Sequence, residues 1–244
     1  MNGGDRPTPD GHERRRPPRL LVLGANGPTG REVVRKALDR GHEVDALTRR
    51  PDSFPLRHER LRVVAGDATD RVVIDDAVAQ AEAVVCTIGT KFTRRAVDVY
   101  STSAHLLITA MARHEKRRVI VVTSSGVAPS QHRRGLVQKG SYALMRRTFA
   151  RTVYDDMTRM ESYVAGSGLD WTIVRPPGLT NSPGRGYVAQ ETEIDGALCA
   201  RADLATMLLD QLTDDRYRRR IAAVMTPGLQ VSALQMVREE VLKR

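Results

Sequence analysis

The stretch RLLVLGANGPTGREVVRKAL, residues 19–38, decides the fold that we expect for this chain of 244 residues. Residues 20–23 form a short apolar run, which is typical of a buried strand. Glycines follow at positions 24, 27 and 30, and apolar residues then recur at helical period over residues 33–38. Thr29 and Glu32 fit a capping box, so the helix is expected to begin near Thr29. The stretch predicts a strand, a tight turn and an amphipathic helix.

The glycine spacing suits a turn that holds a dinucleotide. Gly24 permits the tight turn out of the strand, Gly27 removes a Cβ that would block phosphates, and Gly30 lets the helix pack closely on the sheet. Unpaired N–H groups and the positive end of the helix dipole then face the anionic pyrophosphate. Glycine-rich turns also occur without a ligand. Here a strand precedes the glycines and a helix follows them, which favours nucleotide binding.

Strands and helices alternate along the rest of the chain. Further strands are predicted at residues 42–48, 61–65, 83–88, 119–123, 171–174 and 221–225. Helices are predicted at residues 72–80, 97–114, 141–165, 201–212 and 231–242, with a loop at 178–186. This alternation predicts an α/β fold, a Rossmann-type doubly wound parallel sheet with a small C-terminal extension on the substrate side.

Length and composition predict one domain with a tail. Residues 1–18 are rich in Gly, Pro and Arg and have no periodic apolar positions, so we expect a disordered N-terminal tail. Residues 19–244 are expected to form a single NAD(P)-binding Rossmann domain, with its substrate-side elements at about residues 176–244. We expect a monomer or a weak homodimer.

Composition also limits the partners that we expect. No apolar run approaches the roughly 20 residues that span a bilayer, and residues 1–19 lack the apolar segment of a secretory signal. Two isolated cysteines, Cys86 and Cys199, favour a reducing compartment, so we expect a cytoplasmic protein with no membrane partner. The net charge of +10 is not interleaved with aromatic residues, which argues against nucleic acid. The six histidines show no metal-ligand spacing. A small-molecule substrate is therefore expected, and no metal.

Ligands of such a sheet bind beyond the carboxyl ends of its strands, which selects the residues that follow each strand. The predicted cofactor-binding residues are Gly24, Asn26, Gly27, Pro28, Thr29, Gly30, Arg49, Arg50, Asp67, Ala68, Gly89, Thr90, Ser124, Pro176 and Pro177. The predicted substrate residues are Ser125, Gly178 and Leu179.

The end of the second predicted strand favours NADPH over NADH. A carboxylate at this place would bind the ribose 2′-hydroxyl of NAD, whereas arginine accommodates the 2′-phosphate of NADP. The strand ends ALTRRP, which places Arg49 and Arg50 there, and Asp45 lies too early, in mid-strand. Two exposed arginines before a proline are the alternative. Asp67 suits the adenine end of the cofactor, or it is a turn or capping residue.

The spacing GxxGxxG resembles that of the atypical NAD(P)H-binding members of the short-chain dehydrogenase/reductase superfamily. Residues 86–111, residues 153–189 with a DD-x-x-RM run and a PP turn, and residues 200–217 with a DL-helix-LTxDxY run narrow this resemblance. In this order they are similar to the biliverdin reductase B family of NADPH-dependent flavin reductases. The likeness covers about residues 19–227. The loop between residues 125 and 154 is longer here, and Gly178 replaces the histidine of the family's PPH turn.

The resemblance implies direct hydride transfer to a flavin or a linear tetrapyrrole, and quinones are further candidates. The Tyr-x-x-x-Lys pair of many short-chain dehydrogenases is missing, because Tyr154 is followed by Thr158 and Tyr142 by Arg146. The catalytic candidates are Ser124, which matches the serine of the family's TSA motif, and Tyr154. Ser124 is alternatively a strand-end hydroxyl that bonds the backbone.

Two functions remain open at this point. One is an NADPH-dependent reductase of a flavin or an aromatic, quinone-like metabolite. The other is a non-catalytic NADP-binding sensor, similar to NmrA-type regulators, which also carry GxxGxxG and lack Tyr-x-x-x-Lys. The compact length and the reductase-like C-terminal half favour the enzyme.

Overall fold

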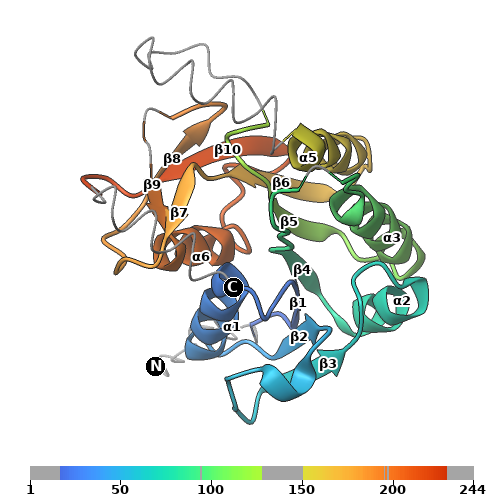
Figure 1. Ribbon diagram of the computed structural model, residues 1–244. Coiled ribbons are helices and arrows are strands. Elements are labelled where there is room, and N and C mark those ends of the chain that lie inside the picture. Colours follow the sequence, from blue (N-terminus) through green and yellow to red (C-terminus); the bar gives the residue numbers. More distant parts are fainter. Residues whose placement is uncertain (1–16, 94, 128–150, 195, 197, 230–244) are drawn as a thin grey trace, which may run out of the picture.

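An eight-stranded sheet with helices on both faces forms the centre of the molecule (Figure 1). The computed structural model describes residues 17–93, 95–127, 151–194, 196 and 198–229. The strands of the sheet are β1 (Leu20–Leu23), β2 (Val44–Thr48), β3 (Leu61–Ala65), β4 (Ala83–Cys86), β5 (Arg118–Val122), β6 (Asp170–Arg175), β8 (Val188–Glu191) and β10 (Arg220–Met225). Their order is β3-β2-β1-β4-β5-β6-β10-β8, and all neighbours are parallel except β8, which is antiparallel to β10. The predicted Rossmann-type sheet is confirmed.

The sheet separates two apolar cores. Helices α1 (Pro28–Asp39) and α6 (Arg201–Asp210) cover one face, and α2 (Arg71–Gln80), α3 (Val99–Arg113) and α5 (Arg151–Ala165) cover the other (Figure 1). A short 3-10 turn, η1 (Pro51–Ser53), follows β2. The chain passes from β1 to β2 on one side of β1, whereas β4 lies on the other side of β1. The strand order therefore reverses between β1 and β4. Ligands of open α/β sheets bind above such a reversal.

A two-stranded sheet forms the C-terminal extension. It pairs β7 (Gly178–Thr180) with β9 (Leu198–Ala200) in parallel. The predicted loop at residues 178–186 is therefore wrong over its first three residues, and β9 was not predicted. Both strands have only three residues, and their pairing partner lies about 20 residues away, so no local pattern reveals them.

The predicted capping box at the start of α1 is also wrong. The helix begins at Pro28, and Gly27 is its N-cap without a side-chain hydrogen bond. Proline is favoured at the first helical position because its fixed φ suits the helix and its missing N–H needs no partner. Thr29 is buried, and Glu32 forms an ion pair with Arg35 at 2.7 Å instead of turning back to the cap.

Asp45 links the first three strands of the sheet through hydrogen bonds to two arginines. Its carboxylate is fully buried in the middle of β2 and accepts two hydrogen bonds from Arg19 and two from Arg62, at 2.8–3.1 Å. Burial alone would raise the pKa of Asp45, but the hydrogen bonds and charges of Arg62 and Arg19 outweigh it and lower the pKa. The mid-strand carboxylate thus links β2 to β3 and to the residue that precedes β1.

Candidate functional site

Two of the three glycines in the β1–α1 turn are required by the fold itself. Gly24 has a φ of +72°, and a Cβ there would lie 2.7 Å from the carbonyl oxygen of Thr87. A Cβ on Gly30 would lie 2.7 Å from the Cα of Ala25 in the same turn. Van der Waals repulsion forbids both approaches, so any side chain would push the turn away from β4 or lift α1 off the turn.

Gly27 differs, because its backbone conformation suits any residue and a Cβ there would press on only one atom of the described chain, a contact that is tight but not a clash. Its φ of −72° and ψ of 160° are an extended conformation that any residue adopts. Of the described chain, a Cβ there would meet only the carbonyl oxygen of Gly24 within 4 Å, at 3.2 Å. The missing side chain therefore leaves open space beside the first turn of α1.

The N-terminus of α1 also lacks a capping carboxylate of the kind found at α2 and α3. Asp70 accepts from Val72 N–H at 2.8 Å and from Val73 N–H at 3.3 Å at the start of α2. Asp156, which belongs to α5, accepts from the N–H groups of Tyr100 and Ser101 at the start of α3. Helix α1 has no such side chain, so the partial positive charge of its first turn is available to an anion.

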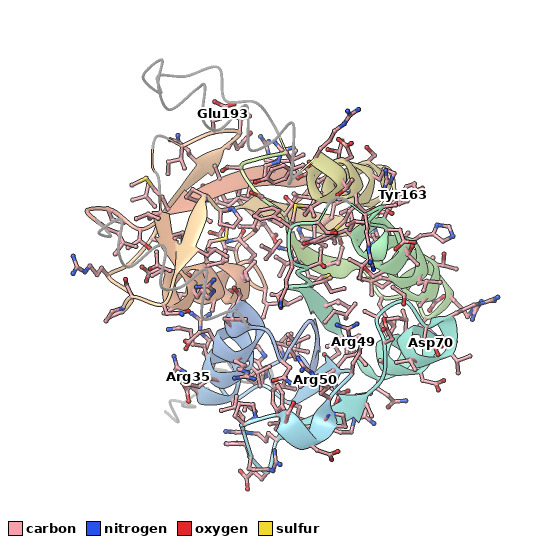
Figure 2. All side chains as sticks on the ribbon, in the orientation of Figure 1. Arg35, Arg49, Arg50, Asp70, Tyr163 and Glu193 are labelled. Carbon is pink, nitrogen blue, oxygen red and sulfur yellow. The ribbon has the colours of Figure 1, made fainter. Side chains whose placement is uncertain are left out.

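Arg49 and Arg50 follow β2 directly, and Figure 2 labels them next to each other at the end of that strand. The Arg49 side chain is 76% exposed and its guanidinium lies 3.8 Å from the carboxylate of Asp67. Asp67 closes its own turn, since it accepts from the N–H and hydroxyl of Thr69 at 2.9 and 2.8 Å. These hydrogen bonds, with the charge of Arg49, lower the pKa of Asp67.

Asn26 joins the glycine turn to the loop after β2. Its Nδ2 donates to Ser53 Oγ at 3.0 Å and lies 3.5 Å from the carbonyl oxygen of Arg50. Its Oδ1 accepts from Arg31, from Nε at 3.0 Å and from the terminal nitrogen at 2.7 Å. Arg31 was not among the predicted residues, because its connection to Ser53 runs through an amide and has no sequence spacing that would reveal it.

The carboxyl ends of β5 and β6 lie side by side and are held in place by hydrogen bonds. The Ser125 N–H donates to the carbonyl oxygen of Pro176 at 2.9 Å. Beneath them, the buried carboxylate of Glu161 on α5 accepts from the hydroxyl of Thr123 at 2.6 Å and from Arg175 Nε at 2.9 Å. This bridge holds the carboxyl ends of β5 and β6 at a fixed separation.

Ser124 lies between these two strand ends and is partly exposed. Its hydroxyl oxygen accepts a hydrogen bond from the N–H of Gly126 at 3.1 Å. The alternative in which this hydroxyl bonds the backbone therefore holds for its oxygen atom. Its O–H donates to no described residue. A serine held in this way can still donate its proton to a bound molecule.

Tyr154 is a buried residue of α5. It is 6% exposed and belongs to the apolar core under α2, α3 and α5. Its ring packs at 6.0 Å, centroid to centroid, against that of Phe92, which is 48% exposed in the loop after β4. The ring of Tyr154 thus contacts the loop that follows the carboxyl end of β4.

The remaining predicted site residues differ in how far they are exposed to solvent. Ala68 and Leu179 are half-buried and pack against the two apolar cores, and Thr29 is buried. Those that remain more open are Pro28, Gly89, Thr90, Pro177 and Gly178. Thr90 N–H donates to the Tyr100 hydroxyl at 3.1 Å, and burial raises the pKa of Tyr100 to about 12. Tyr142 and Arg146 lie outside the described residues.

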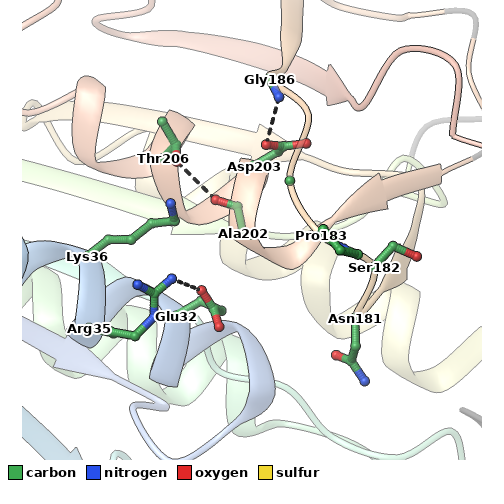
Figure 3. A pocket seen from close by; sticks show the side chains of 11 residues that line it. Glu32, Arg35, Lys36, Asn181, Ser182, Pro183, Gly186, Ala202, Asp203 and Thr206 are labelled. Atoms are coloured by element: carbon green, nitrogen blue, oxygen red, sulfur yellow. Dashed lines mark hydrogen bonds and ion pairs between the residues drawn. The ribbon is translucent and has the colours of Figure 1, made fainter.

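A hollow of about 570 Å³ opens elsewhere, between α1, α6 and the loop after β7 (Figure 3). Arg35 and Lys36 line one wall. The loop is fixed on α6 by the carboxylate of Asp203, which accepts from the N–H groups of Arg185 and Gly186 at 3.0 and 3.1 Å. None of the predicted site residues lines this hollow, so it is separate from the candidate site.

Comparisons with known proteins agree with this geometry. A family model described as NAD(P)H-binding matches residues 24–215. An uncharacterised chloroplastic protein of Arabidopsis thaliana is 29% identical over 192 residues, which cover 72% of this chain and 64% of the relative. The chain thus spans less than two thirds of that relative's length. None of the described helices is long and apolar enough to cross a membrane.

Two solved structures share the fold. A short-chain dehydrogenase/reductase of Veillonella parvula in complex with NADP has a TM-score of 0.72 and 20% identity, covering 87% of this chain and 96% of its own. An anaerobilin reductase of Escherichia coli O157:H7 has a TM-score of 0.66 and 21% identity, covering 88% of this chain and 100% of its own. These two structures show the Rossmann-type fold that the sequence predicted.

Proposed function

Because the chain belongs to the NAD(P)H-binding family, we propose that it is an NADPH-dependent reductase of a flavin or an aromatic, quinone-like molecule. The family and its structural neighbours indicate an NAD(P)-dependent oxidoreductase. The preference for NADPH, the acceptor and the residue roles are our proposal. The anaerobilin reductase supports an electron-poor acceptor of the tetrapyrrole kind.

Gly27 is the observation that carries the cofactor assignment. The fold demands Gly24 and Gly30, whereas at position 27 a Cβ would only lie 3.2 Å from one carbonyl oxygen, a tight contact that a small shift relieves. A pyrophosphate that approaches the uncapped first turn of α1 supplies that reason, since a side chain at this place would occupy the space of the phosphates.

The end of β2 supports NADPH over NADH. It carries Arg49 and Arg50 and no carboxylate, and the nearby carboxylate of Asp67 is occupied by Thr69 and faces Arg49. Arginine donates charge-assisted hydrogen bonds to a phosphate, whereas a carboxylate would repel it.

The residues of the β5 and β6 ends suit an acceptor that needs positioning more than acid catalysis. Bound NADPH supplies the hydride. Ser124 holds its hydroxyl at the strand end and donates a proton there, or water does so in its place. Ser125 and the exposed Gly178 border the acceptor side, and Tyr154 stays in the core.

Turnover tests the reductase directly. Absorbance of NADPH at 340 nm would be followed with FMN, biliverdin and a panel of quinones, with NADH as the comparison. We expect oxidation of NADPH with at least one acceptor. Binding of NADPH without turnover of any acceptor in the panel contradicts the reductase and favours the non-catalytic sensor, which the burial of Tyr154 also suits.

Replacement of Gly27 tests the cofactor turn. Gly27→Val puts a branched side chain into the open space beside α1, so the fold should persist while NADPH no longer raises the melting temperature. Gly166→Val is the matched control, because its Cβ would lie 3.3 Å from the Ser162 carbonyl oxygen at the far end of α5. Retention of the wild-type shift by Gly27→Val, in a folded protein, removes Gly27 from the site.

A further inference from the structure

Arg31 lies where the first turn of α1 meets the loop after β2. Asn26 Oδ1 holds its guanidinium through two hydrogen bonds, of 2.7 and 3.0 Å. The amide nitrogen of the same Asn26 donates to Ser53 Oγ at 3.0 Å. One amide thereby fixes an arginine of the helix to the loop that carries Arg50.

The charge of Arg31 is not neutralised by any described residue. Neither Arg31 nor Arg50 forms an ion pair within the described part of the chain, and Arg49 has only the 3.8 Å approach to Asp67. Arg35, one turn further along α1, differs: it pairs with Glu32 at 2.7 Å and with Asp39 at 3.2 Å. Positive charge therefore accumulates at the corner between α1 and the end of β2.

The guanidinium of Arg31 also has N–H groups left to donate to a ligand. Arginine has five N–H donors, and Asn26 takes one from Nε and one from a terminal nitrogen of Arg31. The three that remain have no partner among the described residues. The pyrophosphate needs the backbone N–H groups of the turn, whereas the ribose of the adenosine lies at the end of the second strand.

We propose that Arg31, positioned by Asn26, binds the 2′-phosphate of NADP together with Arg49 and Arg50 and is a determinant of cofactor specificity. The proposal rests on the NADPH-binding function proposed above. It adds a residue of the helix to a phosphate subsite that the loop after β2 would otherwise form alone.

Calorimetric titration of NADP⁺ and NAD⁺ into the full chain tests the proposal. Arg31→Gln keeps a polar side chain but removes the charge, so NADP⁺ affinity should fall about tenfold or more. NAD⁺ affinity should change less than about twofold, because NAD⁺ has no 2′-phosphate. Arg35→Gln is the matched control on the same helix, and it should leave both affinities unchanged.

Asn26 gives a second, independent variant. Asn26→Ala releases Arg31 from its fixed position, so NADP⁺ should bind several-fold more weakly. Adding Arg31→Gln to Asn26→Ala should then cost less than it does in the wild type, since the two side chains act as one unit. Thermal melting without cofactor confirms that each variant is folded.

The outcomes separate this proposal from the one it rests on. A wild-type protein that binds neither dinucleotide overturns the proposed function. A wild-type protein that prefers NADP⁺, with an Arg31→Gln variant of equal affinity, overturns only the role of Arg31. Equal weakening of NADP⁺ and NAD⁺ by Arg31→Gln also overturns it, because the arginine then contacts a part that both share.

Discussion

At the scale of a single residue, Tyr154 is a catalytic candidate that lies buried on α5. It is 6% exposed, and its ring lies against Phe92 in a core of apolar side chains. Removing its hydroxyl by Tyr154→Phe should keep turnover within about tenfold of the wild type, because direct hydride transfer needs no tyrosine to ionise. Loss of a general acid usually costs roughly 10²–10⁴-fold.

The measurement is turnover, with the primary isotope effect of 4-deuterated NADPH, on an acceptor that the panel identifies. Ser124→Ala serves as the comparison, and it should lower turnover modestly because water can replace a hydroxyl as proton donor. A thousandfold loss in Tyr154→Phe, with cofactor affinity and fold intact, contradicts the assignment and points to carbonyl reduction through this tyrosine.

The sequence selected the candidate site residues, but it could not show the contacts among them. Strand ends identify Arg49, Arg50 and Ser125, because a parallel sheet brings all its carboxyl ends to one edge. Arg31 was not predicted, because its position depends on the side-chain amide of Asn26, which also bonds Ser53, 27 residues further along the chain. The sequence assigned a tight turn to Gly24 and close packing of the helix to Gly30, and in the structure a side chain at either place would clash with backbone atoms.

At the scale of elements, Asp156 shows what the DD-x-x-RM run contributes to the fold. Its buried carboxylate, on α5, accepts from the N–H groups of Tyr100 and Ser101 and from Arg159, and so caps the start of α3. The motif that supported the family resemblance therefore joins two helices, and this contact accounts for its aspartate without a catalytic role.

Replacing this cap should destabilise the protein. Asp156→Ala leaves two buried N–H groups without an acceptor, so the free energy of unfolding should fall by about 2–4 kcal/mol. Asp155→Ala is the control next to it, since Asp155 is exposed and only approaches Arg151 at 3.5 Å; it should cost less than about 0.5 kcal/mol. Urea unfolding measures both, and equal effects would contradict the cap.

The link among β1, β2 and β3 predicts a dependence of stability on pH. The pKa of Asp45 is lowered in the folded protein, because its two arginine partners outweigh the cost of burial. An unfolded aspartate titrates near pH 3.9. The contribution of Asp45 is therefore present above about pH 4 and is lost as the pH falls through the lower, folded value.

Urea unfolding from pH 6 to pH 3 measures this contribution. The wild type should lose stability below about pH 4 more steeply than Asp45→Asn, which cannot ionise. The variant should already be weaker at pH 6, because Arg19 and Arg62 lose their charged partner. Parallel pH profiles for the two proteins would show that Asp45 keeps an ordinary pKa.

Element prediction succeeded where the pattern is local and failed where it is not. Apolar runs, which are typical of strands buried on both faces, predicted the presence of β1 and β4. For β3, both predicted ends match those of the structure. The strands β7 and β9 are short and pair only with each other, so their apolar content is too small to detect. Predicted helical residues 141–150 and 231–242 lie outside the described residues.

At the scale of the whole molecule, the candidate site depends on the reversal of strand order between β1 and β4. The turn after β1 approaches β4 so closely that Gly24 lies against Thr87, and the ends of β5 and β6 continue the same edge. The two apolar cores, one under α1 and α6 and one under α2, α3 and α5, hold this edge rigid from both faces. A dinucleotide along it would contact parts of the sheet that are distant in sequence.

Binding along this edge should therefore stabilise the whole fold. A ligand at about 100 times its Kd adds about 2.7 kcal/mol to the free energy of unfolding, which for a domain of this size raises the Tm by roughly 5–10 °C. If NADH binds about tenfold more weakly, the same concentration of NADH should give about half the shift. Thermal melting of the full chain with each cofactor measures the difference, and Gly27→Val serves as the variant without a shift. Equal shifts with NADPH and NADH contradict the preference assigned to Arg49 and Arg50, whereas a larger shift with NADPH ties that preference to the cations at the end of β2.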